Sequence, residues 1–387
     1  MPWDLPIWAY FLYVASYTFI FSLAARISAS RPLPIIAHNT PLAYLIPAYR
    51  EDAVILSTVK ALLAVRKTGE VIIVVADGLQ PHTLQALSEW DVLVQEVQFA
   101  TSSKVKSLRV GLERVPDQIA HVLILDADNH LDPQAHPYIA ALLQQGWEAL
   151  QIRRIAKNLD SHWALLDGLS EALNQAIYRA GPAAIGWAPQ LSGSGMVFEK
   201  KLLKACLAGW DTAGGFDREL EIQVLQRGKK IAFLGEAVIW DEKVNSGAVF
   251  SQQRRRWVSS QYHFLRKHWR LGWRGLWQGN GALFHSSVLR NIQLPRVLNL
   301  GLLSLWVLLK ILLGSMGGLT LLWWVGLWGM LVAGVGLAIP RSYLSFRLFQ
   351  ALWILPGAFW RMFMVLFRLQ KADQAHYATP HEETEHS

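Results

Sequence analysis

The chain has 387 residues; 52% of them are hydrophobic, only 17% are charged, and the mean hydropathy is +0.22. Together with 18 tryptophans, this balance is unusual for a purely soluble protein and points to a membrane. The net charge of +8 does not indicate nucleic acid, because no zinc-ligand set or basic helix of suitable spacing accompanies it. The basic residues instead flank apolar segments, which favours contact with anionic lipid headgroups.

Residues 5–25 form the first apolar stretch and carry no formal charge. About 20 apolar residues are needed to cross a bilayer, so this stretch is just long enough. It lacks the basic start and the cleavage site of a signal peptide, which favours a retained anchor over residues 1–30. Arg26 and Arg31 follow the stretch and only Asp4 precedes it, so the positive-inside rule places the next domain in the cytoplasm.

Residues 40–245 have the pattern of a soluble α/β domain. Apolar strands are predicted first at 42–46, where Pro47 breaks the run, and then at 71–75, 92–97 and 122–125. Helical patterns separate these strands, and such alternation implies a parallel, doubly wound sheet. Later elements are predicted as strands at 149–152, 231–234 and 237–240 and as helices at 160–180 and 214–226.

Carboxylates follow three of the predicted strands. Glu51 comes shortly after the first, Asp77 ends the second, and Asp126 and Asp128 follow the fourth. Because the carboxyl ends of parallel strands lie along one edge, these side chains are expected to converge there. Two carboxylates one residue apart suit a hard divalent cation shared with a phosphate-bearing ligand. An isolated Asp-x-Asp is more often a polar strand end or a helix cap. The hypothesis of a cation site therefore depends on the expected convergence of the carboxylates from three strands.

Two later segments leave structural and functional interpretations open. Gly193-Ser194-Gly195 alternates glycines, either to let a backbone approach a ligand or to make a bend. Asp217 stands in the first turn of a predicted helix, where the helix dipole favours a carboxylate whatever its function.

Residues 246–296 are basic, aromatic and poor in acids. Lysine, arginine and tryptophan mixed in this way are typical of a helix lying in the headgroup layer. A surface segment explains Gln253, Arg256 and Trp257 less well, because their spacing forms a Gln-x-x-Arg-Trp motif.

A second membrane region covers residues 297–339. Lys310 is the only charge between Arg296 and Arg341. At about 1.5 Å per residue this length allows two crossings, which we place near 297–314 and 318–339. Lys310 is expected to snorkel to the outer interface.

The end of the chain is less regular. Residues 343–370 are apolar and aromatic but interrupted by Pro356 and several arginines. This pattern favours an interfacial helix, with a further span as the alternative. Residues 371–387 form a polar tail. The whole layout predicts a multi-pass protein of the cell (inner or plasma) membrane with its α/β domain in the cytoplasm.

The motifs, in this order, resemble those of family 2 glycosyltransferases with a GT-A fold, specifically the membrane-bound branch of cellulose, chitin and hyaluronan synthases. The resemblance covers roughly residues 40–265, and the ordered set is strongly specific although no single motif is. The residues that carry it are Pro47-Ala48-Tyr49-Arg50-Glu51, Ala76-Asp77-Gly78, Lys104, Asp126-Ala127-Asp128, Gly193-Ser194-Gly195-Met196, Asp217 and Gln253-Arg254-Arg255-Arg256-Trp257.

The resemblance implies a Rossmann-like α/β domain that binds a nucleotide sugar, with UDP as the expected nucleotide. Ala48, Tyr49 and Glu51 would line the uridine pocket, and Asp77 would read the base or ribose side. The full set implied for the nucleotide sugar is Ala48, Tyr49, Glu51, Asp77, Lys104, Asp126, Gln253, Arg256 and Trp257.

The resemblance also implies the chemistry of transfer. Asp126 and Asp128 would hold Mg²⁺ or Mn²⁺, which stabilises the charge on the departing diphosphate. Asp217 would be the base that deprotonates the acceptor hydroxyl in an inverting transfer. The synthases usually have Thr-Glu-Asp at this base, whereas this chain has Gly-Phe-Asp. The implied acceptor-binding residues are Gly193, Ser194, Gly195 and Trp257.

The predicted function is therefore an inverting, metal-dependent transfer of a sugar to a growing polysaccharide or lipid-linked glycan at the cytoplasmic membrane face. One alternative is transfer of a single sugar to polyprenyl phosphate. Another is an inactive, nucleotide-binding partner of a glycan export assembly. Expected partners are the nucleotide-sugar donor, the acceptor, membrane lipids and export or polysaccharide-assembly proteins.

Overall fold

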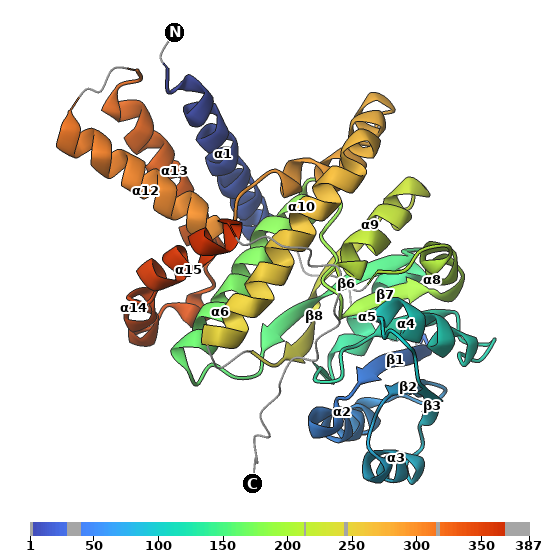
Figure 1. Ribbon diagram of the computed structural model, residues 1–387. Helices are drawn as coiled ribbons and strands as arrows, with labels where there is room; N and C mark the ends of the chain where they lie inside the picture. The colour runs from blue at the N-terminus through green and yellow to red at the C-terminus, as the bar shows by residue number, and fades with distance from the viewer. Residues whose placement is uncertain (1–2, 29–39, 213, 244–246, 315–317, 368–387) are drawn as a thin grey trace. The chain divides into compact units, whose positions relative to one another are not determined.

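The computed structural model describes residues 3–28, 40–212, 214–243, 247–314 and 318–367 (Figure 1). The chain divides into two compact units. Among the described residues, the α/β unit comprises 40–157 and 188–242. The helical unit comprises 3–28, 158–187 and the described part of 243–367. Residues 158–187 therefore group with the helical unit, whereas the sequence suggested one continuous α/β domain from 40 to 245.

An eight-stranded sheet with the order β3-β2-β1-β4-β7-β6-β8-β5 forms the centre of the α/β unit. β1 is parallel to β2 and β4, β2 to β3, and β6 to β8. β7 is antiparallel to β4 and β6, and β5 is antiparallel to β8. The strands are β1 Leu42–Tyr49, β2 Val71–Asp77, β3 Leu93–Val97, β4 His121–Ile124, β5 His130–Leu131, β6 Ala149–Ala156, β7 Met196–Glu199 and β8 Ala232–Asp241.

The predicted α/β class is confirmed, and the four strands predicted first, β1 to β4, pair in parallel as expected. β5 and β7 are antiparallel to their neighbours. The apolar run of β7 marks a buried strand without encoding its direction. β7 is reached after the excursion of residues 158–187 into the helical unit, and it returns antiparallel to β6.

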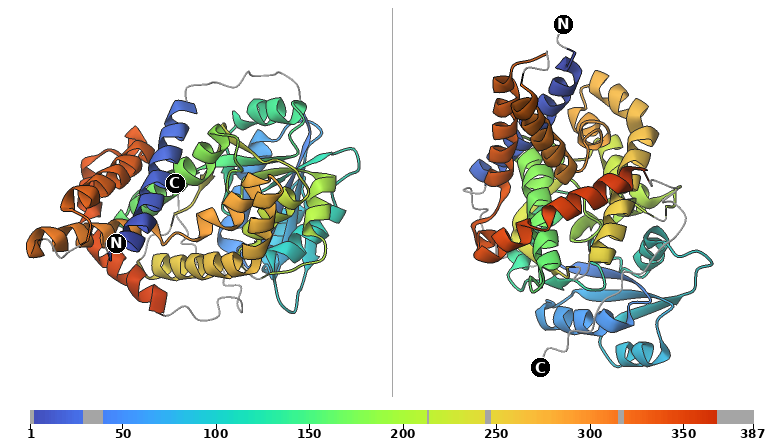
Figure 2. Two further views of the ribbon diagram at one scale, coloured as in Figure 1. Left: turned by 90° about the horizontal axis from the view of Figure 1, so that it is seen from above. Right: turned by 60° about the vertical axis from the view of Figure 1, so that its left-hand side comes forward.

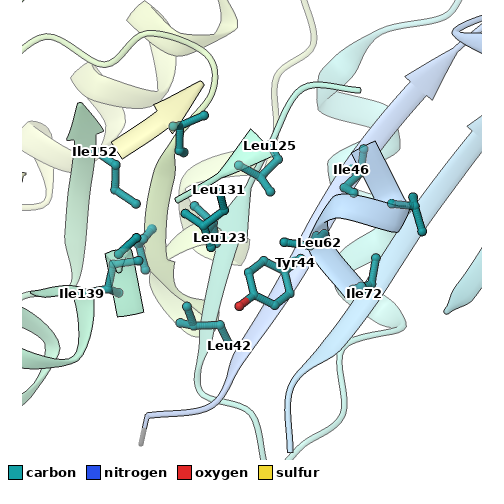
Figure 3. Packing of buried hydrophobic residues seen from close by; sticks show 14 of the residues in the cluster. Leu42, Tyr44, Ile46, Leu62, Ile72, Leu123, Leu125, Leu131, Ile139 and Ile152 are labelled. Atoms are coloured by element: carbon teal, nitrogen blue, oxygen red, sulfur yellow. The ribbon is translucent and has the colours of Figure 1, made fainter. Parts of the chain in front are cut away.

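Helices cover both faces of the sheet and bury the alternating side chains of its strands. On one face, Tyr44 and Ile46 of β1 pack in a core with Leu62 and Ile139 (Figure 3). On the other face, Leu45 packs in a second core with residues of α4, α8 and α9. The helices of this unit are α2 Asp52–Val65, α3 Pro81–Ser88, α4 Lys104–Glu113, α5 Ala135–Gln144, α8 Lys200–Leu207 and α9 Phe216–Gln226.

Several strands run further than predicted, and two of the differences have a clear physical reason. β1 continues through Pro47 to Tyr49, because the pairing with β4 ends at Leu45 and a proline there interrupts only one neighbour. The two closing strands predicted at 231–234 and 237–240 are one strand, β8, with a register shift opposite Ile152 and Arg153.

Three helices of the helical unit, α1 Leu5–Ser28, α12 Arg296–Leu313 and α13 Leu321–Ala338, are long and apolar enough to cross a membrane. They match the three predicted spans and share one apolar cluster, side by side in Figures 1 and 2. The other helices of this unit are α6 His162–Asn174, a π-helical turn Gln175–Ala180, α7 Gly181–Ala184, α10 Gly247–Trp277, α11 Gly281–Ser287, α14 Phe346–Leu352 and α15 Leu355–Phe367, with short 3₁₀ turns at Leu289–Asn291 and Arg341–Tyr343.

The segment predicted as one interfacial helix over 343–370 is instead two short helices, α14 and α15. α15 has 13 residues, too few to cross a bilayer, and no other candidate span is found in the described part of the chain. Pro356 stands in the first turn of α15, where a proline is tolerated and the preceding helix cannot continue.

Packing explains why residues 158–187 group with the helical unit. Leu166 and Leu169 of α6 lie in one apolar cluster with Tyr343 and Leu348. The start of α7 lies directly against α1, since a Cβ at Gly181 would lie 2.3 Å from the carbonyl oxygen of Phe21.

A buried ion pair ties α12 to the start of α1. Nζ of Lys310 lies 2.9 Å from Oδ2 of Asp4, and these side chains are 3% and 0% exposed. The backbone amide of Leu319 and the indole of Trp324 also donate to Asp4. Lys310 therefore does not snorkel as predicted, because a carboxylate within reach compensates its charge inside the unit.

Candidate active site

The ends of β1 and β2 meet at one edge of the sheet. Tyr49 and Asp77 are paired residues of the two strands, and the backbone amide of Arg50 donates to the carbonyl oxygen of Asp77 at 3.1 Å. Arg50 has a positive φ of 55° and Gly78 one of 71°, so the chain turns sharply after both strands. This turn places a charged and an aromatic side chain together, with Arg50 lying over the Tyr49 ring at 5.3 Å.

Asp77 is 3% exposed, and its Oδ2 has no hydrogen-bond partner within the described residues. A buried carboxylate oxygen without a donor is costly, so this oxygen is a candidate acceptor for a ligand N–H or O–H. Glu51 directly precedes α2, and its carbonyl oxygen accepts from the amides of Val54 and Ile55. The side chain of Ala48 is 1% exposed and belongs to the core, so only its backbone is available to a ligand.

Lys104 brings three segments together. Its ammonium forms an ion pair with Asp126, and donates to the carbonyl oxygen of Gly193 at 2.9 Å. The same ammonium lies 5.1 Å from the ring centroid of Phe216, the first residue of α9. One cation therefore contacts three segments: the Asp-x-Asp turn, the loop Gly193-Ser194-Gly195 (called the glycine loop below) and the start of the helix that carries Asp217.

The start of α4 fixes the position of Lys104. Ser103 caps this helix, its Oγ accepting from the amide of Lys106 and donating to Asp211 at 2.6 Å. Burial raises the pKa of the Asp211 carboxyl, but the bond from Ser103, the charge of Lys106 and the amide of Thr212 outweigh it, so the pKa lies below its usual 3.8. The loop before α9 is thus bound to the start of α4.

Asp128 is nearly buried at the second position of the Asp-x-Asp motif. Nδ2 of Asn129 donates to its Oδ1 at 2.9 Å, and Lys157 donates to its backbone carbonyl. Burial lowers the pKa of Lys157, while the carboxylates of Asp128 and its neighbours Glu242 and Asp241 oppose that shift. The carboxylate of Asp128 therefore lies in a partly buried, charged environment with a fixed orientation.

The glycine loop is clamped to the sheet. Gly193 and Gly195 have φ values of +81° and +65°, and a Cβ on Gly195 would lie 2.9 Å from Ile239 Cδ1. Gln151 donates to the carbonyl oxygens of Ser194 and Gly195 at 3.0 and 3.2 Å. The Ser194 hydroxyl is buried and donates to Asn129, so it is used inside the protein rather than presented to an acceptor.

Asp217 lies half-buried in the first turn of α9, which begins after Gly215 in a left-handed conformation. Across the described residues its carboxylate accepts no hydrogen bond. The helix dipole favours a carboxylate here without any hydrogen bond, so both interpretations of Asp217 stay open. Gly193 lies close to the same turn, because its Cβ would contact the Phe216 ring at 3.5 Å.

The Gln-x-x-Arg-Trp motif lies on α10 of the helical unit. The side chains of Gln253 and Arg256 are outside the described part of the structure. Trp257 is 41% exposed, and Arg254 stacks over its ring at 4.5 Å while pairing with Asp167 at 2.8 Å. The nucleotide role of these residues stays a prediction.

The part of the chain that the structure describes supplies only a few potential metal ligands, which leaves coordination positions for a substrate. Within the described residues, no three His, Cys, Asp or Glu side chains gather as a metal site. Asp126 and Asp128 alone fit Mg²⁺ or Mn²⁺, which are commonly held by one or two carboxylates together with phosphate oxygens of the substrate. The half-exposed carboxylate of Asp126 is accessible to such a ligand.

Sequence reasoning assigned no role to Asn129, Gln151, Arg154 or Asp241, which hold the site in place. Two signals were present: an amide residue directly after the Asp-x-Asp motif, and a glutamine inside the apolar strand 149–152. Buried polar side chains in such positions indicate hydrogen bonding to a neighbouring segment.

Residues 38–260 match the model of the family described as "Glycosyltransferase like family 2". This match covers more than half of the chain. The chain belongs to glycosyltransferase family 2. The predicted family is thereby confirmed.

One sequence relative and one solved structure are similar to this chain. The probable glycosyltransferase YdaM of Bacillus subtilis (strain 168) is 24% identical over 239 residues, which cover 58% of this chain and 56% of YdaM. The chain thus matches little more than half the length of that relative. The structure of the mannosyltransferase PcManGT from Pyrobaculum calidifontis, in complex with GDP-Man and Mn²⁺, covers 91% of this chain and 98% of its own. At 14% identity and a TM-score of 0.55, it shows a shared fold, and the predicted GT-A fold is confirmed.

Proposed function

We propose that the chain transfers a sugar from a nucleotide-sugar donor, with UDP as the nucleotide, to a growing polysaccharide or lipid-linked glycan. The observation that carries this proposal is the position of Lys104. Its ammonium contacts Asp126, the backbone of Gly193 and the ring of Phe216, which neighbours Asp217. Donor-binding, acceptor-binding and base residues thus belong to one cluster.

The donor is bound by complementary groups along the sheet edge. The buried, unpartnered oxygen of Asp77 accepts an N–H or O–H from the base or ribose. Tyr49 and the turn at Arg50 flank that position. Lys104 offsets negative charge of the diphosphate, because an ammonium is a compact phosphate partner.

Asp126 and Asp128 hold Mg²⁺ or Mn²⁺ with the diphosphate. When bound, the metal stabilises the charge that develops on the leaving oxygen. The Mn²⁺ in the complex of PcManGT, which shares the fold, is consistent with a divalent cation in this family.

Asp217 acts as the base of an inverting transfer. Its carboxylate takes the proton of the acceptor hydroxyl as the acceptor oxygen bonds to the anomeric carbon. The bond between that carbon and the diphosphate oxygen breaks, and its electron pair leaves with the nucleoside diphosphate. A carboxylate already bound to backbone amides would be a weaker base, and Asp217 has no such bond among the described residues.

The three apolar helices keep this reaction at a membrane, and the positive-inside rule favours a cytoplasmic catalytic unit. The acceptor is then a glycan or lipid-linked saccharide within reach of the bilayer surface. Transfer of one sugar to polyprenyl phosphate is the second candidate, supported by the short membrane part.

The test uses membranes that contain the full chain. They are incubated with labelled UDP-glucose, UDP-N-acetylglucosamine or GDP-mannose, and products are separated by size. We expect one UDP-sugar to label a product, as a ladder for polymer synthesis or as one glycolipid for single transfer. EDTA should abolish labelling, and membranes with Asp128→Asn should label at least about 100-fold less.

Other outcomes would contradict the proposal at separate points. Labelling from GDP-mannose alone would show that the donor nucleotide is GDP and not UDP. Labelling that survives EDTA would contradict the requirement for a divalent metal. Tight binding of UDP without any transfer would favour the inactive partner of an export assembly.

A further inference from the structure

Asn129 follows the Asp-x-Asp motif directly and is 1% exposed. A side-chain amide has two donor hydrogens and two acceptor lone pairs, and Asn129 uses all four. Nδ2 faces two carboxylate oxygens, and Oδ1 faces an amide N–H and a hydroxyl. Only this orientation of the amide makes every contact a donor–acceptor pair.

The donor half of Asn129 holds a carboxylate. Nδ2 donates to Oδ1 of Asp128 at 2.9 Å and to Oδ1 of Asp241 at 3.2 Å. Asp128 therefore cannot rotate without losing a buried hydrogen bond, and the second bond fixes Asn129 to the end of β8.

The acceptor half of Asn129 joins the motif to the glycine loop. Oδ1 accepts from the backbone amide of Asp126 at 3.3 Å and from the Ser194 hydroxyl. Oγ of Ser194 in turn accepts from the same Asp126 amide at 3.0 Å. These three groups form a closed ring of hydrogen bonds.

Asp241 is itself anchored. Arg154 donates to Oδ2 of Asp241 at 2.7 Å and to the carbonyl oxygen of Ser192 at 2.8 Å. The two side chains are 14% and 6% exposed, so the pair is largely shielded from water. The network thus connects β6, β8, the glycine loop and the Asp-x-Asp turn through Asn129.

We propose that Asn129 is a positioning residue for the divalent-cation site: it fixes the orientation of the Asp128 carboxylate and the position of the Asp126 backbone. The inference rests on the proposed function, in which these two aspartates hold the cation. Groups that orient a ligand carboxylate by hydrogen bonding commonly change metal affinity by about 10–100-fold when removed.

The experiment measures Mn²⁺ binding itself. Purified full chain in detergent is titrated with Mn²⁺ at fixed UDP, and free Mn²⁺ is followed by its electron paramagnetic resonance signal. Asn129→Ala removes both halves of the amide. Asn129→Ser is a milder truncation that keeps one hydroxyl near the Asp126 amide. Both should bind Mn²⁺ about 10–100-fold more weakly, with kcat at saturating Mn²⁺ reduced less than kcat/KM at low Mn²⁺.

Tyr44→Phe is the matched control. It deletes a buried hydrogen bond from the Tyr44 hydroxyl to Glu70, 2.6 Å long, near the start of β1, whereas the Asp-x-Asp turn follows the carboxyl end of β4. It should reduce stability without changing Mn²⁺ binding. A merely structural role for Asn129 would make its variants behave like this control.

Each outcome is decisive. Wild-type Mn²⁺ affinity in a folded Asn129 variant would overturn the positioning role and leave the proposed function intact. Failure of the wild-type protein to bind Mn²⁺ with UDP would overturn the metal-dependent function and this inference together. Weaker binding in the Asn129 variants, with unchanged binding in Tyr44→Phe, supports both.

Discussion

At the scale of single residues, the candidate site combines one cation with three carboxylates in unequal environments. Asp126 is ion-paired with Lys104, Asp128 is oriented by Asn129, and Asp217 accepts no hydrogen bond among the described residues. Such differences in environment are how similar side chains take different roles, which we propose here are two cation ligands and one base.

Replacing Asp217 by asparagine keeps its shape but removes the proton acceptor. We expect the rate of transfer to fall by at least about 100-fold, the lower end of what general bases contribute, while UDP binding stays unchanged. Asp117→Asn is the control, since that side chain lies fully exposed beside Lys200. Rates are measured with the labelled donor and binding by calorimetry; substantial turnover in Asp217→Asn would rule out the base.

The Asp211 carboxylate is expected to contribute to folding stability in a pH-dependent way. Because its pKa is lowered in the folded protein, its interactions stabilise the fold above the unfolded value, near 3.8, and are lost as pH falls through the folded value. The difference in unfolding temperature between wild type and Asp211→Asn should therefore be largest above pH 3.8 and shrink below it. A constant difference down to strongly acidic pH would contradict the assigned interactions with Ser103 and Lys106.

At the scale of elements, the two ends of β1 serve different purposes. The carboxyl end meets β2 at the candidate site. Tyr44, labelled in Figure 3, lies near the other end and bonds with Glu70 and His136, both at 2.6 Å. Burial and the Glu70 carboxylate raise the pKa of Tyr44 far above its usual value, so its hydroxyl stays protonated and donates. This polar cluster closes the amino-terminal end of the sheet.

Tyr44→Phe should therefore lower the free energy of unfolding by about 1–3 kcal/mol, because it leaves the buried Glu70 with one donor fewer. Denaturant unfolding of the purified chain measures the loss. Tyr138→Phe is a suitable control, since Tyr138 is only partly buried against the same core. An unchanged midpoint for Tyr44→Phe would mean that His136 or water replaces the lost donor.

At the scale of the whole molecule, the chain leaves and re-enters its α/β unit. Residues 158–187 depart after β6, join the helical unit, and return before β7. The helical unit is thus assembled from the amino terminus, this excursion and the carboxyl-terminal third. Its stability depends on contacts between segments remote in sequence, such as the bonds that Lys310, Leu319 and Trp324 donate to Asp4.

Lys310→Met should destabilise the helical unit by about 3–5 kcal/mol, because it leaves the Asp4 carboxylate buried without its cation. The double variant Asp4→Asn with Lys310→Met should recover most of the loss, since no unpaired charge remains. Thermal unfolding in detergent compares the three proteins. Equal stability of wild type and Lys310→Met would show that Asp4 is protonated or otherwise compensated.

The sequence by itself determined which three helices are long and apolar enough to cross a membrane, the α/β class and the order of the motifs. These follow from local patterns: apolar length for α1, α12 and α13, and short apolar runs ending in polar residues for β1, β2 and β4. The candidate carboxylates were identifiable because their residue types suit cation and base chemistry.

Only the tertiary structure decided which groups act together. The antiparallel β7, the grouping of residues 158–187 with the helical unit and the pairing of Lys310 with Asp4 depend on contacts that no local pattern encodes. The same is true of Asn129, whose four hydrogen bonds come from three separate segments. A buried polar side chain is defined by its partners, and the sequence places those partners far apart.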